Sequence, residues 1–140
     1  MIRAEHVVKT FREQQVLKGI DFLFEAGKNN LIIGRSGAGK TVLLKILVGL
    51  QVPTSGIVWY DDVNFTALDK QGMRAIRMKI GMLFQGSALF DSLTVEENIR
   101  FPLDMFTPMT LKEKVERVNY CLERVNLGGN NLKYPSELSG

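Results

Sequence analysis

The sequence predicts an α/β fold, and three observations support this prediction. The chain opens with two β-rich runs, residues 2–8 and 16–24, joined by the polar stretch 12–15, which suits a hairpin. The wholly apolar run 31–33 is followed at once by glycines and then by an apolar helical stretch. Such a run is typical of a strand buried on both faces of a parallel sheet. The last third of the chain carries helical periodicity instead.

Composition narrows the class of protein. The 140 residues suit one domain, and 45% hydrophobic with 24% charged residues is typical of a globular chain. A net charge of +3 is too small to indicate a nucleic-acid partner, and none is expected. A single cysteine excludes an internal disulfide. No apolar stretch reaches the roughly 18 residues of a membrane span, so we expect a cytoplasmic location.

The first half of the chain continues the strand and helix alternation. A helix is predicted over residues 41–50 and a strand over 56–60, after turn residues that include Pro53. A second helix is predicted over 69–79, and the short apolar run 80–84 follows it as a further strand.

The second half predicts two capped helices. Thr94 with Glu97, and Thr110 with Glu113, both fit the capping-box pattern Thr-x-x-Glu. The first helix has Pro102 near its predicted end. The second carries an apolar stripe that steps by four and three residues: Leu111, Val115, Val118, Leu122 and Val125.

Residues 34–41 fit the phosphate-loop pattern G-x-x-x-x-G-K-[ST]. Glycines let successive backbone N–H groups point at phosphate oxygens, and the following helix adds its positive end. Lys40 can reach the β- and γ-phosphates, and the Thr41 hydroxyl can ligate Mg²⁺. The loop alone leaves a transporter ATPase, a GTPase and a small-molecule kinase open. The candidate nucleotide contacts are Gly34, Ser36, Gly37, Ala38, Gly39, Lys40 and Thr41.

Four features in order resemble the ATP-binding-cassette family, the ATPase domains of ABC transporters. Phe11 lies 23 residues before Gly34, and the phosphate loop comes second. Leu83-Phe84-Gln85 resembles the Q-loop, and Leu138-Ser139-Gly140, preceded by Tyr134-Pro135-Ser136-Glu137, resembles the opening of the signature motif Leu-Ser-Gly-Gly-Gln. The resemblance covers the whole chain. The guanine-specific Asn-Lys-x-Asp of GTPases is absent from the sequence, which weakens that alternative.

The resemblance implies ATP and Mg²⁺ as cofactors and assigns roles to single residues. Phe11 would stack on adenine, since stacking needs only an aromatic face. Gln85 would touch Mg²⁺ and the attacking water, so the implied catalytic residues are Lys40 and Gln85 and the metal ligands Thr41 and Gln85. Ser139 and Gly140 would meet the γ-phosphate held by a second ATPase subunit in a head-to-tail dimer. The other implied partners are integral membrane permease subunits, with the ATPase peripheral at the inner face of the membrane.

The implied fold is a RecA-like P-loop NTPase core with an N-terminal antiparallel β subdomain and a helical subdomain. Residues 1–84 would form the nucleotide-binding part, and 85–140 the Q-loop and helical subdomain, of a single incomplete ATPase domain. The family's later parts, among them the Walker B Asp, the general-base Glu and the switch His, are not in this sequence. Asp61 and Asp62 read as solvated turn carboxylates rather than a replacement.

Because the positioned base is missing, we expect these 140 residues alone not to hydrolyse ATP, although the full-length protein should. The alternative is a nucleotide-binding remnant without turnover. We also expect apolar strand residues to be exposed, because their neighbours in the family's sheet follow the signature motif.

A finer resemblance lies between the Q-loop and the first helix of the helical half. Residues 84–90, 93–95, 97–98 and 101–103 are similar to the Mla-type branch, whose ATPases serve phospholipid transport. This resemblance implies a lipid cargo, whereas neither the direction of transport nor the membrane subunits follow from it.

Overall fold

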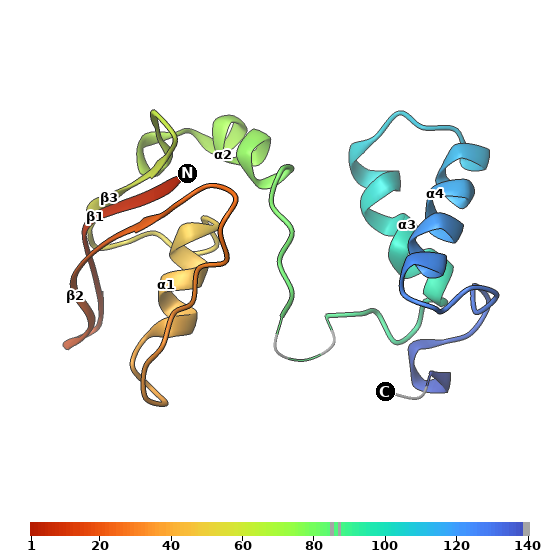
Figure 1. Cartoon of the computed structure of the whole chain (residues 1–140), viewed down its shortest axis with the longest axis horizontal. Coiled ribbons are helices and arrows are strands. Elements are labelled where there is room, and N and C mark those ends of the chain that lie inside the picture. Colours follow the sequence, from red (N-terminus) through yellow and green to blue (C-terminus); the bar gives the residue numbers. More distant parts are fainter. Residues whose placement is uncertain (85, 87, 139–140) are drawn as a thin grey trace. The chain divides into compact units, whose positions relative to one another are not determined.

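The structure is a computed structural model that describes residues 1–84, 86 and 88–138. The chain divides into two compact units, Met1–Met82 and Leu83–Gly140 (Figure 1). Among the residues that the structure describes, no helix is long and apolar enough to span a membrane.

The first unit contains an antiparallel sheet of four strands in the order β2-β1-β3-β4. The strands are β1 (Ile2–Phe11), β2 (Gln14–Phe24), β3 (Ser55–Tyr60) and β4 (Val63–Asn64). The three predicted strands in this region are therefore confirmed, and the hairpin between β1 and β2 turns at Arg12, which has a φ of 53°.

The middle of β1 is irregular on both of its edges. Its register with β3 shifts between Glu5 and Val8, and His6 has a φ of 46°. The His6 N–H leaves the ladder and donates to Asp21 Oδ1 at 2.7 Å. Gly56 of β3, with a φ of 92°, passes so close to this bulge that a Cβ there would lie 2.6 Å from Val7 Cα. The bulge therefore depends on glycine at position 56.

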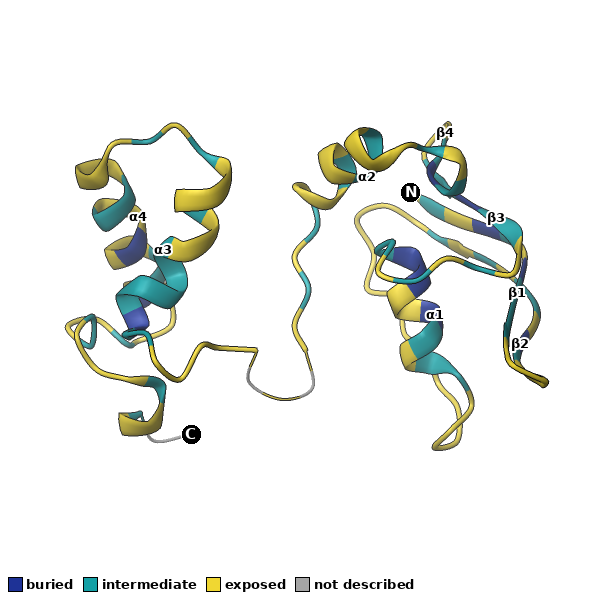
Figure 2. Cartoon of the chain, turned by 180° about the vertical axis from the view of Figure 1, so that it is seen from behind, coloured by how far each residue is buried: buried dark blue, intermediate teal, exposed yellow. Residues whose placement is uncertain are grey.

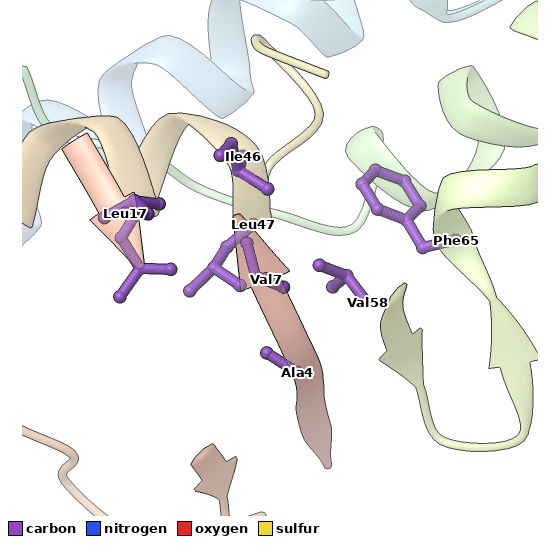
Figure 3. Packing of buried hydrophobic residues seen from close by; sticks show 8 residues of the cluster. Ala4, Val7, Leu17, Ile46, Leu47, Val58 and Phe65 are labelled. Atoms are coloured by element: carbon purple, nitrogen blue, oxygen red, sulfur yellow. The ribbon is translucent and has the colours of Figure 1, made fainter. Parts of the chain in front are cut away.

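The helix α1 (Lys40–Leu47) packs its apolar face against the sheet and forms the core of the first unit with it. Figure 2 shows the buried residues gathered on the facing sides of α1 and the strands, and Figure 3 shows their side chains. The Tyr60 hydroxyl donates to the Leu47 carbonyl at 2.7 Å and so joins β3 to the end of α1. The buried cluster consists of Ala4, Val7, Leu17, Leu43, Ile46, Leu47, Val58 and Phe65.

Burial raises the pKa of Tyr60 to about 12, above its ordinary value of 10.0. Because the folded state holds this proton more tightly, its contribution to stability is complete below pH 10 and is lost as the pH rises toward about 12. We expect the wild-type protein to lose stability across this interval more steeply than Tyr60→Phe, which has no phenol to ionise. Urea unfolding at a series of pH values measures the difference. Parallel curves for the two proteins would contradict the prediction.

The segment after β4 supports the same, C-terminal end of α1. Asn64 caps the 3₁₀ turn η1 (Phe65–Ala67), and Asp69 caps α2 (Lys70–Arg77) by accepting the Gly72 N–H at 2.8 Å. The Arg77 guanidinium donates to the two carbonyls that directly follow α1, those of Val48 and Gly49. The helix predicted over 69–79 is confirmed with slightly shorter bounds.

The two short apolar runs predicted as parallel strands are not strands here. Residues 31–33 and 80–84 have no assigned ladder, and Leu31, Ile33 and Leu83 expose 81%, 85% and 98% of their surface. A strand of this apolar type forms when flanking strands satisfy its backbone. Neither segment has a paired neighbour within the described residues, and the exposure of their apolar side chains is the one expected from the sequence.

The second unit is a pair of helices, α3 (Val95–Phe106) and α4 (Leu111–Arg124), followed by the 3₁₀ turn η2 (Pro135–Glu137). Pro102 lies inside α3 rather than at its end, since the helix continues for another turn. The small core of this unit contains the buried side chains of Val95, Val118 and Leu122, with Ile99, Leu127 and Leu138 packed against them.

Both predicted capping boxes are present. The Glu97 carboxylate accepts the Thr94 N–H at 2.7 Å, while the Thr94 hydroxyl accepts the Glu97 N–H at 3.3 Å. Thr110 and Glu113 repeat the arrangement at the start of α4. The hydrogen bonds to the Thr94 backbone and side chain lower the pKa of Glu97, and those to the Thr110 side chain and backbone lower that of Glu113.

Asp104 joins the two helices of the second unit. Its carboxylate accepts from Lys114 Nζ of α4 at 2.9 Å and from Arg100 Nε one turn earlier on α3 at 3.1 Å. The hydrogen bond from Lys114 is the main cause of its lowered pKa, and the bond from Arg100 adds to it.

We expect the second unit to lose stability in acid. A carboxylate with a lowered pKa stabilises the fold above its ordinary value, 4.5 for Glu97 and Glu113 and 3.8 for Asp104, and the effect is lost as the pH falls through the lower folded value. Hydrogen exchange of the α3 and α4 amides as a function of pH measures this loss. In the double variant Glu97→Gln and Glu113→Gln the acid dependence should be shallower, and an unchanged profile would show that these carboxylates do not cause it.

Candidate nucleotide-binding site

The predicted phosphate loop forms a tight turn between the extended segment 31–33 and α1. Gly37 and Gly39 have φ values of 77° and 88°, and the Ala38 N–H closes the turn on the Arg35 carbonyl at 3.2 Å. Gly39 is the N-cap of α1, and no side chain caps the helix there. The first N–H groups of α1 are therefore free to bind an anion, toward which the positive end of the helix dipole also points.

Lys40 lies folded across this loop. Its ammonium donates to the carbonyls of Gly34 and Arg35 at 2.7 and 2.8 Å. The positive charge of Lys40 is thus held at the loop itself. A phosphate oxygen could replace either carbonyl as the acceptor of the ammonium hydrogen bonds. The phosphate-loop pattern predicts that this lysine reaches the β- and γ-phosphates, and that role stays a prediction.

The remaining loop candidates are exposed around the same turn. Ser36 and Ala38 lie at its tip, and Thr41 lies in the first turn of α1 with its side chain exposed. Mg²⁺ is commonly held by one or two protein oxygens together with the phosphates of the nucleotide. The Thr41 hydroxyl fits that donor set, since it is an oxygen ligand beside the proposed phosphate position. Within the described ranges, no group of three or more His, Cys, Asp or Glu could hold a metal ion without a nucleotide.

Phe11 is the last residue of β1, next to the hairpin turn, and 40% of its surface is exposed. The Lys9 ammonium lies 5.1 Å from the centre of its ring and donates to the Val52 carbonyl at 2.7 Å. An exposed ring held by a neighbouring cation is suited to stacking on a flat ligand. Phe11 and the phosphate loop both belong to the first unit.

Three further predicted site residues, Gln85, Ser139 and Gly140, lie outside the described residues, so their roles stay predictions. Asp61 lies in the turn after β3, where its carboxylate accepts from the Met1 ammonium at 2.7 Å, and Asp62 beside it is exposed. Both acids are turn residues, as interpreted from the sequence.

One contact that supports the loop has no counterpart among the sequence motifs. Gly39 packs on Val16 and Leu17 of β2, whose side chains would lie 3.0 and 2.9 Å from a Cβ at position 39. In the sequence these two residues are only apolar members of a strand. A pairing between residues more than 20 positions apart leaves no local signal.

Comparison with known proteins adds relatives that match over nearly the whole chain. A family model described as "ABC transporter" matches residues 17–140. The chain is 42% identical to methionine import ATP-binding protein MetN 2 of Lactiplantibacillus plantarum and 40% identical to that of Rhodococcus jostii. Each alignment covers 100% of this chain and 42% of the relative. The chain therefore spans about two fifths of the length of the curated relatives it matches.

Two solved structures share the fold. The dimeric post-hydrolysis state of the ATP-binding cassette MJ0796, bound to ADP and Pi, has a TM-score of 0.87 and 31% identity and matches 99% of this chain. The dimeric structure of the bacterial ABC transporter cassette MJ0796 has a TM-score of 0.88 and 32% identity and matches 100%. The match covers 63% and 64% of those chains. The predicted fold class, a cassette-type P-loop NTPase with an antiparallel N-terminal sheet and helices, is therefore confirmed.

Proposed function

The chain belongs to the ABC transporter family, and we propose that it is part of an ATP-binding subunit that couples hydrolysis of Mg-ATP to transport by membrane permease subunits. The observation that carries the proposal is the phosphate loop. Its glycine turn, the uncapped start of α1 and the Lys40 ammonium together offer backbone donors and a positive charge to one phosphate chain.

Each residue of the loop has a distinct part in this proposal. The loop N–H groups orient the phosphates, and Lys40 exchanges the Gly34 and Arg35 carbonyls for β- and γ-phosphate oxygens. Phe11 holds the adenine by stacking, while the Thr41 hydroxyl and the Gln85 side chain would hold the metal ion. When bound, Mg²⁺ neutralises charge that develops on the phosphates.

Replacing Lys40 by alanine is expected to weaken ATP binding about 10- to 150-fold. The variant loses charge-assisted hydrogen bonds to phosphate, worth about 1.5–3 kcal/mol in total. Titration with a fluorescent ATP analogue measures the change. Lys45→Ala is the matched control, because Lys45 is an exposed lysine in the last turn of the same helix. Equal affinity in the wild type and Lys40→Ala would refute the assignment of the loop.

The proposed assembly is a head-to-tail dimer at the inner face of the membrane. Both solved structures of MJ0796 reported above are dimeric, which supports this arrangement. In it, Ser139 and Gly140 of one subunit would meet the γ-phosphate at Lys40 and Thr41 of the other. The expectation that these 140 residues alone do not hydrolyse ATP stays a prediction. Steady phosphate release from them that Lys40→Ala abolishes would refute it.

Two cargoes are candidates, and a different observation favours each. The relatives reported above are named for methionine import, and at 42% and 40% identity they favour methionine. The likeness of residues 84–103 to the Mla-type branch favours phospholipid, but none of the reported relatives supports that finer assignment. Labelled methionine uptake and phospholipid transfer between membranes, each compared between cells with wild-type protein and with Lys40→Ala, distinguish the two. The cargo whose movement depends on Lys40 is the correct one.

A further inference from the structure

The start of α1 rests directly on β2. Gly39 has a left-handed backbone with φ 88°, and a Cβ at this position would lie 2.9 Å from Leu17 Cδ2 and 3.0 Å from Val16 Cγ1. Carbon atoms that are not bonded to each other do not approach this closely. The Gly39 backbone therefore packs against these two side chains with no space between them, and its position depends on theirs.

Leu17 is the more firmly held of the two side chains. It is 3% exposed and belongs to the core cluster that includes Ile46 and Leu47 of α1, whereas Val16 is only half-buried. Figure 3 shows Leu17 beside the α1 side chains in this cluster. Because protein interiors are close-packed, a side chain in this place has little freedom to move. Because Leu17 is fixed in the core and lies against Gly39, the position of β2 restricts the position of the turn at Gly39.

We propose that Leu17 is a positioning residue of the phosphate loop. Its Cδ2 methyl holds Gly39 in the left-handed turn and thereby fixes the direction of the N–H groups that open α1. Lys40 closes the same loop from its other side through the Gly34 and Arg35 carbonyls. The inference rests on the proposed function, since it concerns how the loop binds phosphate. Leu17 itself would not touch the nucleotide.

The test compares two variants that each remove one carbon from the same core. Leu17→Val deletes both δ carbons, among them the Cδ2 that lies against Gly39, and leaves a residue well suited to a strand. Ile46→Val removes a carbon from a side chain that is 1% exposed and lies seven residues beyond Gly39. Dissociation constants for ATP and AMP are measured by competition with a fluorescent ATP analogue, on the protein as its gene encodes it. Thermal unfolding of each variant reports its general stability.

We expect Leu17→Val to weaken ATP binding about three- to tenfold, because loss of sub-ångström positioning is costly at such sites. AMP binding should stay unchanged, since AMP lacks the β- and γ-phosphates that the loop orients. Ile46→Val should change neither constant. Leu17→Ile conserves volume but leaves a single δ carbon, and is expected to weaken ATP binding about two- to threefold. It serves as the test if Leu17→Val does not fold.

The outcomes separate the two proposals. Failure of the wild-type protein to bind ATP would overturn the proposed function. If the wild type binds and Lys40→Ala does not, the loop assignment stands, and unchanged ATP affinity in both Leu17 variants overturns the positioning role. The positioning role is also overturned if Leu17→Val weakens AMP binding as much as ATP binding, or if Ile46→Val weakens ATP binding as much as Leu17→Val does. Either result points to general loosening of the core.

Discussion

Replacing Gly56 by alanine is expected to lower the free energy of unfolding of the first unit by about 2–6 kcal/mol. The residue has a φ of 92°, which strains any residue with a Cβ, and the added methyl would meet the His6 carbonyl group and Val7 Cα. Strain of this kind costs about 1–3 kcal/mol and overpacking about 1–3 kcal/mol more. The obstructing atoms belong to the backbone of β1, so they cannot move aside as the end of a side chain could.

Gly27→Ala is the matched control for this prediction. Gly27 also has a positive φ, 71°, but nothing lies within 4 Å of the position of its Cβ. The control therefore carries the backbone strain without the collision. Urea unfolding of both variants measures the difference, and equal losses would show that the bulge at His6 accommodates a side chain at position 56.

Replacing Phe65 by alanine is expected to lower the free energy of unfolding of the first unit by about 3–5 kcal/mol. Phe65 is 1% exposed, its ring centre lies 4.9 Å from that of Tyr60, and its edge fills the space beside Gly49. Removing the ring leaves a cavity where β3 and the end of α1 meet. Guanidinium unfolding measures the loss.

Leu23→Ala on β2 provides the comparison, because Leu23 is a large apolar residue of the same sheet that is 50% exposed. The loss at Leu23 should stay well below that of Phe65→Ala, since half of the Leu23 surface stays in water in the folded state and its removal leaves no buried cavity. A loss at position 23 as large as at position 65 would contradict the location of the core.

The features that the sequence predicted well are those specified by neighbouring residues. The capping boxes at Thr94 and Thr110 each need only four residues, and the structure has both. The phosphate-loop pattern is equally local, and Lys40 donates to the Gly34 carbonyl of that loop, while the binding of phosphate there stays a prediction. The roles of Gln85 and of the signature residues depend on parts of the chain outside the described residues and stay predictions.

The features that the sequence did not predict depend on partners far along the chain. The runs 31–33 and 80–84 have the composition of strands but pair with no strand in the part of the chain that the structure describes, so composition alone was not sufficient. The bulge at His6 requires Gly56, and the loop support at Gly39 requires Leu17. None of these pairs is visible until the backbone brings the residues together.

The two ends of α1 differ in their hydrogen-bond partners, and this difference affects the electrostatic potential along the helix. The carbonyls at its end accept from the Tyr60 hydroxyl and the Arg77 guanidinium, while its start has no capping side chain. A cation beside the negative pole of a helix offsets that pole, so an anion at the opposite end experiences a more positive potential. If the loop binds phosphate as proposed, Arg77, which is remote in sequence from the loop, adds to the positive potential that the phosphate meets at Gly39.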